Sequence, residues 1–81
     1  MGVLRILSRR GDDAVRYDVA RAQAGDAEAI AAVREAERIF NEARAQGATG
    51  FAVRPGQAPV PLRQFDEQEE QIIMVPRVVG G

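Results

Sequence analysis

The residues with the clearest chemical potential are the last two of the sequence, Gly80 and Gly81. A carboxylate is a poor electrophile until attack on the α-phosphate of ATP makes it an acyl adenylate, a step that Mg²⁺ and enzyme positive charge stabilise. Glycine has no Cβ, so a Gly-Gly end can enter a channel too narrow for other residues. We therefore expect Gly80 and Gly81 to be the site of adenylation and conjugation, with Gly81 joined to AMP by an activating enzyme.

The composition argues against chemistry of the chain's own. It contains no cysteine and no histidine, which removes thiol nucleophiles, disulfides, imidazole bases and the usual zinc sites. We expect no enzyme activity, no bound metal and no bound cofactor, since ATP and Mg²⁺ would be used by the activating enzyme. A net charge of −1 gives no reason to expect a nucleic-acid partner.

No membrane contact is expected either, because no apolar run approaches the roughly 20 residues that a membrane helix needs. The first residues lack the pattern of a signal peptide, so a cytoplasmic location is expected. All eleven basic residues are arginine. Biased codon usage in a GC-rich genome would explain this, and the chain would in either case be unable to build lysine-linked chains on itself.

Two apolar runs predict the centre of a sheet. Residues 3–7 and 72–75 are apolar at both parities, broken only by Arg5, which is typical of strands that lie centrally or are covered on both faces. From Val15 to Val19 apolar and polar residues alternate, which predicts an edge strand in a hairpin with the first, through a turn at residues 8–13.

One long helix is predicted between these runs. Asp26 is a good N-cap, residues 27–46 place their apolar side chains on about half of the circumference, and Gly47 follows as the residue that closes the helix. Residues 22–25 are expected to be a short connector. The charged arc of the helix is expected to face solvent.

The rest of the body reads as three short strands. We expect the third at residues 51–54 and the fourth at 62–65, while Pro59 and Pro61 confine the stretch around Val60 to an edge or a loop. An acidic turn at residues 66–71 leads into the last strand, and Pro76, which cannot donate to a ladder, ends the sheet.

This order of elements predicts an α+β fold. The first and last strands should be central, adjacent and parallel, because the helix between them can carry the chain back across one face. That is the β-grasp (ubiquitin-like) fold, a mixed sheet packed on one long helix, with residues 1–75 as the domain. Residues 76–81 would form a flexible tail that reaches about 20 Å when extended.

At this point the whole chain resembles the ubiquitin-like β-grasp superfamily, and in particular the bacterial ubiquitin-like modifiers. The tail carries the resemblance: Ile72-Ile73-Met74-Val75-Pro76-Arg77-Val78-Val79-Gly80-Gly81. Arg77 stands where ubiquitin has an arginine that its activating enzyme reads, and two exposed valines, Val78 and Val79, suit an apolar groove on a partner. The resemblance implies an activating enzyme, a conjugating enzyme, a deconjugating protease and target proteins as partners.

A second branch of the superfamily shares part of this pattern. In the sulfur carriers of molybdopterin and thiamine synthesis, apolar residues, proline and Gly-Gly also end the chain, although Arg77 stands where a second proline is frequent. Those carriers usually have a Gly-Asp-Glu-like turn before the last strand, and residues 67–71 contain no glycine. The modifier is therefore favoured, with a sulfur carrier or a non-conjugated β-grasp interaction module as the alternatives.

Overall fold

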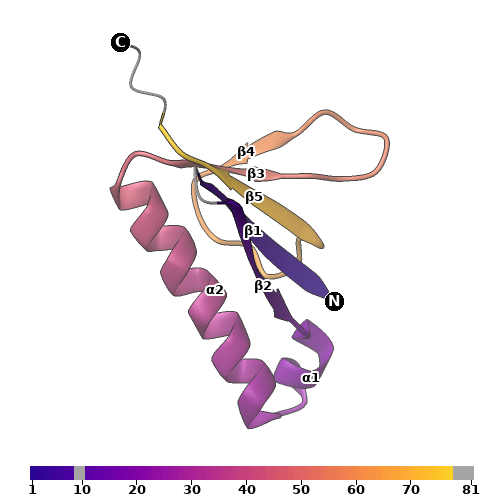
Figure 1. The fold of residues 1–81 in the computed structure, drawn as a ribbon. Helices are drawn as coiled ribbons and strands as arrows, with labels where there is room; N and C mark the ends of the chain where they lie inside the picture. Colours follow the sequence, from indigo (N-terminus) through magenta and orange to yellow (C-terminus); the bar gives the residue numbers. More distant parts are fainter. Residues whose placement is uncertain (9–10, 78–81) are drawn as a thin grey trace.

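The computed structural model describes residues 1–8 and 11–77 of the 81-residue chain. Figure 1 shows a sheet with one long helix across it and a short helix at one end. In chain order the elements are β1 (Gly2–Ser8), β2 (Gly11–Tyr17), α1 (Val19–Gln23), α2 (Ala27–Ala45), β3 (Thr49–Ala52), β4 (Val60–Leu62) and β5 (Gln71–Val75).

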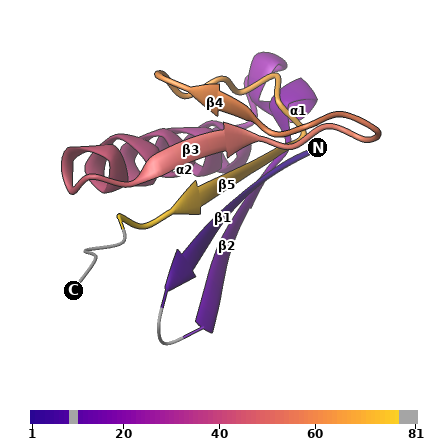
Figure 2. The ribbon, with the colours of Figure 1, turned by 90° about the horizontal axis from the view of Figure 1, so that it is seen from above.

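The five strands form one mixed sheet in the order β2-β1-β5-β3-β4 (Figure 2). β1 and β5 are its centre and run parallel, with Leu4 opposite Ile72 and Ile6 opposite Met74, and every other pair is antiparallel. The predicted parallel pair of first and last strands is thus confirmed. The fold is α+β, with the arrangement of the β-grasp.

The core lies between the sheet and α2. Strand pleating turns alternate residues toward the helix, and its largest buried side chains are Leu4, Tyr17, Phe40, Ile72 and Met74. The ring of Phe65 packs edge-to-face against both Tyr17 and Phe40, with centroid separations of 5.7 and 6.0 Å. A single aromatic cluster therefore joins β2, α2 and the loop after β4.

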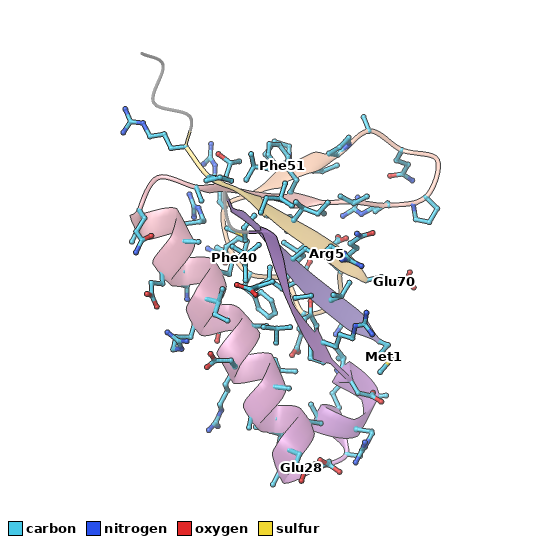
Figure 3. The ribbon with its side chains drawn as sticks, in the orientation of Figure 1. Met1, Arg5, Glu28, Phe40, Phe51 and Glu70 are labelled. Atoms are coloured by element: carbon cyan, nitrogen blue, oxygen red, sulfur yellow. The ribbon has the colours of Figure 1, made fainter. Side chains whose placement is uncertain are left out.

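The strand residues that point away from α2 include a second group of apolar side chains. Val3, Leu7, Phe51 and Ile73 are half-buried and alternate with the core residues. Figure 3 shows Phe40 between α2 and the sheet and Phe51 on the side of the sheet away from α2. The runs that are apolar at both parities therefore reflect a central position, with the helix on one face.

α2 begins and ends where the sequence predicts. The Asp26 side chain accepts a hydrogen bond of 2.9 Å from the Ala29 backbone amide, which satisfies a free donor of the first turn. At the other end Gly47 has φ of +97°, and its amide donates to the Arg44 carbonyl at 2.9 Å. The Ala48 amide donates to the Ala43 carbonyl at 3.0 Å, completing a Schellman motif.

The second strand begins and ends earlier than predicted, and residues 11–13, which were expected in the turn, belong to it. β2 ends at Tyr17, and Val19 belongs to α1, whose last residues lie in the predicted connector. Asp18 explains the difference, because its side chain caps the helix by accepting from the Arg21 amide at 3.1 Å. Arg21 also pairs with Asp26 at 2.6 Å, which fixes the turn between the helices. The alternation that predicted a strand through Val19 was wrong at its end.

The strands β3 and β4 begin two residues earlier in the sequence than predicted. β3 covers Thr49–Ala52, where 51–54 was expected, because Gly50 faces the core and lets α2 approach. β4 covers Val60–Leu62, where 62–65 was expected, and Phe65 packs into the aromatic cluster instead. Pro61 is tolerated because β4 is an edge strand, as the prolines indicated.

Neither helix in the described part of the chain is both long enough and apolar enough to cross a membrane.

Candidate functional site at the base of the tail

The structure places only part of the predicted site. Gly80, Gly81, Val78 and Val79 lie outside the described residues, so their predicted roles stay predictions. Arg77 is the last described residue and is exposed, as is Pro76 before it. The site that can be built from the structure is therefore the base of the tail, where the chain leaves the sheet.

The chain leaves the sheet next to the end of α2. β5 ends at Val75, which lies opposite Thr49 of β3, and Pro76 follows without strand structure. Figure 1 shows the end of β5 beside the last turn of α2, while Met1 lies at the far end of the central strands. This separation follows from the parallel pairing of β1 and β5.

The side chain of Arg77 folds back onto the helix end. A Cβ built on Gly47 would lie 3.1 Å from Cδ of Arg77, 3.4 Å from its Cβ and 3.8 Å from its Cγ. The aliphatic stem of Arg77 thus lies over the bare Cα of the glycine that ends α2. Arg77 is nevertheless exposed, since an arginine can pack its stem and keep its charge in solvent.

Electrostatics favour a cation at this place. The free carbonyls at the C-terminus of a helix carry a partial negative charge that stabilises nearby positive groups. Arg44 lies in the last turn of α2 and donates a hydrogen bond to the backbone carbonyl of Arg63, which follows β4. Arg44 and Arg77 thus both place positive charge at the end of the helix from which the tail departs.

A shallow groove of about 470 Å³ opens beside Arg77. Its walls come from the ends of β1, β5 and α2 and are mainly apolar, with Gln46 and Arg77 as its long polar side chains. Its lining residues are Ile6, Leu7, Ala43, Gln46, Ala48, Met74, Pro76 and Arg77. None of these lining residues carries a nucleophile or a general base.

Sequence reasoning found Arg77 but missed its partner Gly47, which it used only as the end of a helix. The register between β3 and β5 contains the missing signal. Thr49 pairs with Val75 in an antiparallel ladder, and continuing that register by two residues places Gly47 opposite Arg77. The strand boundaries must be known before this contact can be found, and β3 was predicted two residues too late.

At the opposite end of β5 the acidic turn has a structural role. Glu69 is only 8 % exposed, and its carboxylate accepts hydrogen bonds from Arg54, including two from Nε of 3.1 Å each. The hydrogen bonds and charge of Arg54 hold the pKa of Glu69 below its ordinary value against the opposing effect of burial. This ion pair joins the loop before β5 to the chain that leaves β3.

Tyr17 is anchored to the same turn. Its hydroxyl donates to the Glu69 backbone carbonyl at 3.4 Å. Burial, followed by the carboxylates of Asp66, Glu67 and Glu69, raises the pKa of Tyr17 to about 12. The sequence predicts an acidic turn here, and the structure adds that the turn is held to β2 by Tyr17 and to the chain after β3 by Arg54.

No metal site accompanies these features in the described part of the chain, where no three acidic side chains are grouped so as to hold an ion. Comparison with protein-family models gives no match, and searches of curated proteins and of solved structures give none either. The fold and the geometry of the tail base therefore carry the functional argument.

Proposed function

We propose that this protein is a bacterial, cytoplasmic ubiquitin-like modifier whose Gly81 carboxylate is activated and then conjugated to amines of target proteins. The observation that carries the proposal is the base of the tail. A β-grasp body ends its central strand at Val75, and Arg77 is held at the edge of the body two residues later. The four residues that follow Arg77 are two valines and two glycines, and the glycines suit a channel too narrow for other residues.

The proposed reaction has three steps, and partner enzymes catalyse all of them. An oxygen of the Gly81 carboxylate attacks the α-phosphorus of ATP, and pyrophosphate leaves to give an acyl adenylate. The thiolate of an enzyme cysteine attacks the acyl carbon and AMP leaves, so that a thioester forms. An amine of the target then attacks the thioester, the thiolate leaves, the nitrogen gives a proton to a base, and an amide bond remains.

The chain's own residues bind and orient in this scheme. The guanidinium of Arg77 offers a forked set of donors that suits a carboxylate on the activating enzyme. Val78 and Val79 fill an apolar groove beyond it, and Gly80 and Gly81 pass through the narrow channel to the nucleotide. Every lysine that accepts Gly81 belongs to another protein, because the sequence has none.

A sulfur carrier is the second candidate, and the Val75-Pro76 step at the start of the tail favours it. In that case a sulfide-level sulfur on a partner enzyme attacks the acyl carbon of the Gly81 adenylate, AMP leaves, and release of the sulfur from its donor leaves a thiocarboxylate at Gly81. The third candidate is a β-grasp interaction module that is never activated. Both share the fold with the modifier, so the fold alone does not separate them.

Mass analysis of the intact C-terminus separates the three. The protein is expressed with the enzymes encoded beside its gene, and its products are compared with those of a variant that lacks Gly80 and Gly81. A Gly81-to-amine linkage to another protein, absent from the truncated variant, supports the modifier. The mass change of one oxygen replaced by sulfur supports the carrier. If neither product forms and the truncated variant binds its partners unchanged, both proposals are wrong.

A further inference from the structure

We infer that Gly47 is a positioning residue for the tail: its bare Cα is a seat for the stem of Arg77, which holds the base of the tail against the body and sets how Arg77 is offered to the activating enzyme. The existence of the seat depends on the structure alone. Its use in recognition rests on the proposed function.

Two requirements meet at Gly47. Its φ of +97° lies in the left-handed region, where a Cβ is disfavoured, and the space that a Cβ would need is occupied by Arg77. Within residues 1–8 and 11–77 three other glycines also have positive φ, and a Cβ on any of them would have no atom within 4 Å. Ending a helix requires only the positive φ, so the contact with Arg77 is a second reason for glycine at position 47.

The seat is built from rigid parts. Gly47 is held by the Schellman hydrogen bonds at the end of α2, and β3 begins two residues later. β3 in turn pairs with β5, which leads into Arg77. The contact therefore links the end of β5 back to the end of α2. It holds the chain against the body for two residues beyond the last strand.

The contact between Gly47 and Arg77 shortens the stretch of chain that lies between the body and the carboxylate of Gly81. If the tail were free after Val75, residues 76–81 would reach about 20 Å, whereas residues 78–81 reach about 14 Å when fully extended. An activating enzyme that binds both the body and the tail then orders fewer residues, which lowers the entropic cost of binding. Loss of the seat should raise KM for the modifier in adenylation and leave kcat unchanged, because the bound geometry at Gly81 is the same.

The first experiment tests the seat on the isolated protein. Asparagine adopts the left-handed conformation more readily than other non-glycine residues, so Gly47→Asn fills the seat with less backbone strain than another side chain would cause. Gly25→Asn is the matched control, since Gly25 has φ of +93° and open space. Limited trypsin cleavage between Arg77 and Val78 is followed by intact mass under conditions in which both variants are folded.

We expect Gly47→Asn to speed this cleavage several-fold, because a displaced Arg77 stem enters the protease pocket more easily, and Gly25→Asn to leave the rate unchanged. Equal rates in wild type and Gly47→Asn would overturn the seat. A loss of backbone order at Pro76 and Arg77 in nuclear magnetic resonance relaxation, confined to Gly47→Asn, would support it independently.

The second experiment tests the use of the seat, with the activating enzyme and labelled ATP. Gly47→Asn should raise KM several-fold at unchanged kcat, and it should add nothing further in an Arg77→Ala background, since the two changes remove one interaction. An unchanged KM, or a full effect in the Arg77→Ala background, would overturn the positioning role. If wild-type protein is never adenylated, the proposed function fails, and the cleavage experiment still decides whether the seat exists.

Discussion

The ring of Phe40 lies so close to the bare Cα of Gly50 that a methyl group there would stand 2.4 Å from its Cε2 atom. The sulfur of Met74 would be 3.1 Å from the same methyl group. This contact sets the separation between α2 and the strands β3 and β5. Gly2 accommodates Tyr17 in a similar way, because a Cβ built on Gly2 would lie 2.3 Å from Cε2 of Tyr17. Glycine thus stands against each of the two fully buried aromatic side chains, Tyr17 and Phe40.

Gly50→Ala should therefore destabilise the protein through overpacking. We expect a loss of about 1–3 kcal/mol in the free energy of unfolding, measured by urea denaturation. Replacing the Phe40 ring with a smaller side chain should relieve the overpacking. The double variant Phe40→Leu with Gly50→Ala should therefore lose less free energy of unfolding than the sum of the two single variants. Strict additivity of the two costs would show that the ring and the glycine do not determine each other.

Tyr17 predicts a loss of stability in alkali. An unfolded tyrosine ionises near its ordinary pKa of 10, whereas the pKa of folded Tyr17 is about 12. Between these values the unfolded state binds fewer protons than the folded state, so the free energy of unfolding falls as pH rises, by about 2–3 kcal/mol in total. Denaturation at a series of pH values measures the fall.

The control for this prediction is Tyr17→Phe, whose stability should be much flatter over the same range. Tyr17 is the single tyrosine of the chain, so tyrosinate absorbance reports its ionisation directly. An absorbance midpoint at the ordinary value near 10 in the folded protein would contradict the burial that raises this pKa.

The Arg54–Glu69 ion pair predicts the opposite dependence in acid. Because Arg54 lowers the pKa of Glu69 from its ordinary 4.5, the stabilisation is complete above that value and is lost as pH falls through the lowered pKa. Arg54→Met should destabilise the protein most near neutral pH, and its difference from wild type should shrink in acid. Arg34→Met, at an exposed helix position, is the matched control and should show little effect at any pH. A difference for Arg54→Met that stays constant with pH would assign its cost to packing alone.

Under the proposed function, replacing a tail valine should weaken binding to the activating enzyme without affecting folding. Val79→Ser should raise KM for adenylation about tenfold, the size expected when an apolar side chain leaves a buried pocket at an interface. Val79→Ile keeps the apolar contact and should stay close to wild type. Thermal unfolding of all three proteins should coincide. A serine variant that is adenylated like wild type would show that this position is not read.

The sequence predicted the topology because its strongest signals concern the centre of the sheet. Two runs apolar at both parities, separated by a helix, required a parallel central pair, and β1 and β5 form it. Asp26 and Gly47 marked the ends of α2 because capping is local chemistry. These features depend on a few neighbouring residues, so they can be read without the fold.

The errors arose where two local patterns compete or where contacts are distant. Val19 fits both the alternation of a strand and the first turn of a helix, and the cap at Asp18 decides for the helix. Gly50 looks unfavourable in a strand until the ring of Phe40 is placed against it. The seat of Arg77 on Gly47 and the pairing of Arg54 with Glu69 join residues far apart in sequence, and no local rule reports them.

The parallel pairing of β1 with β5 also bears on when a newly synthesised chain can fold. β1 and β2 can form a hairpin as soon as they leave the ribosome, but the inner edge of β1 has no partner until residues 71–75 have been made. The sheet therefore cannot be completed until the strand that leads into the tail has been made. A product that stops before this strand cannot complete its sheet, so the body can be completed only in chains that already contain the strand leading to Pro76 and Arg77.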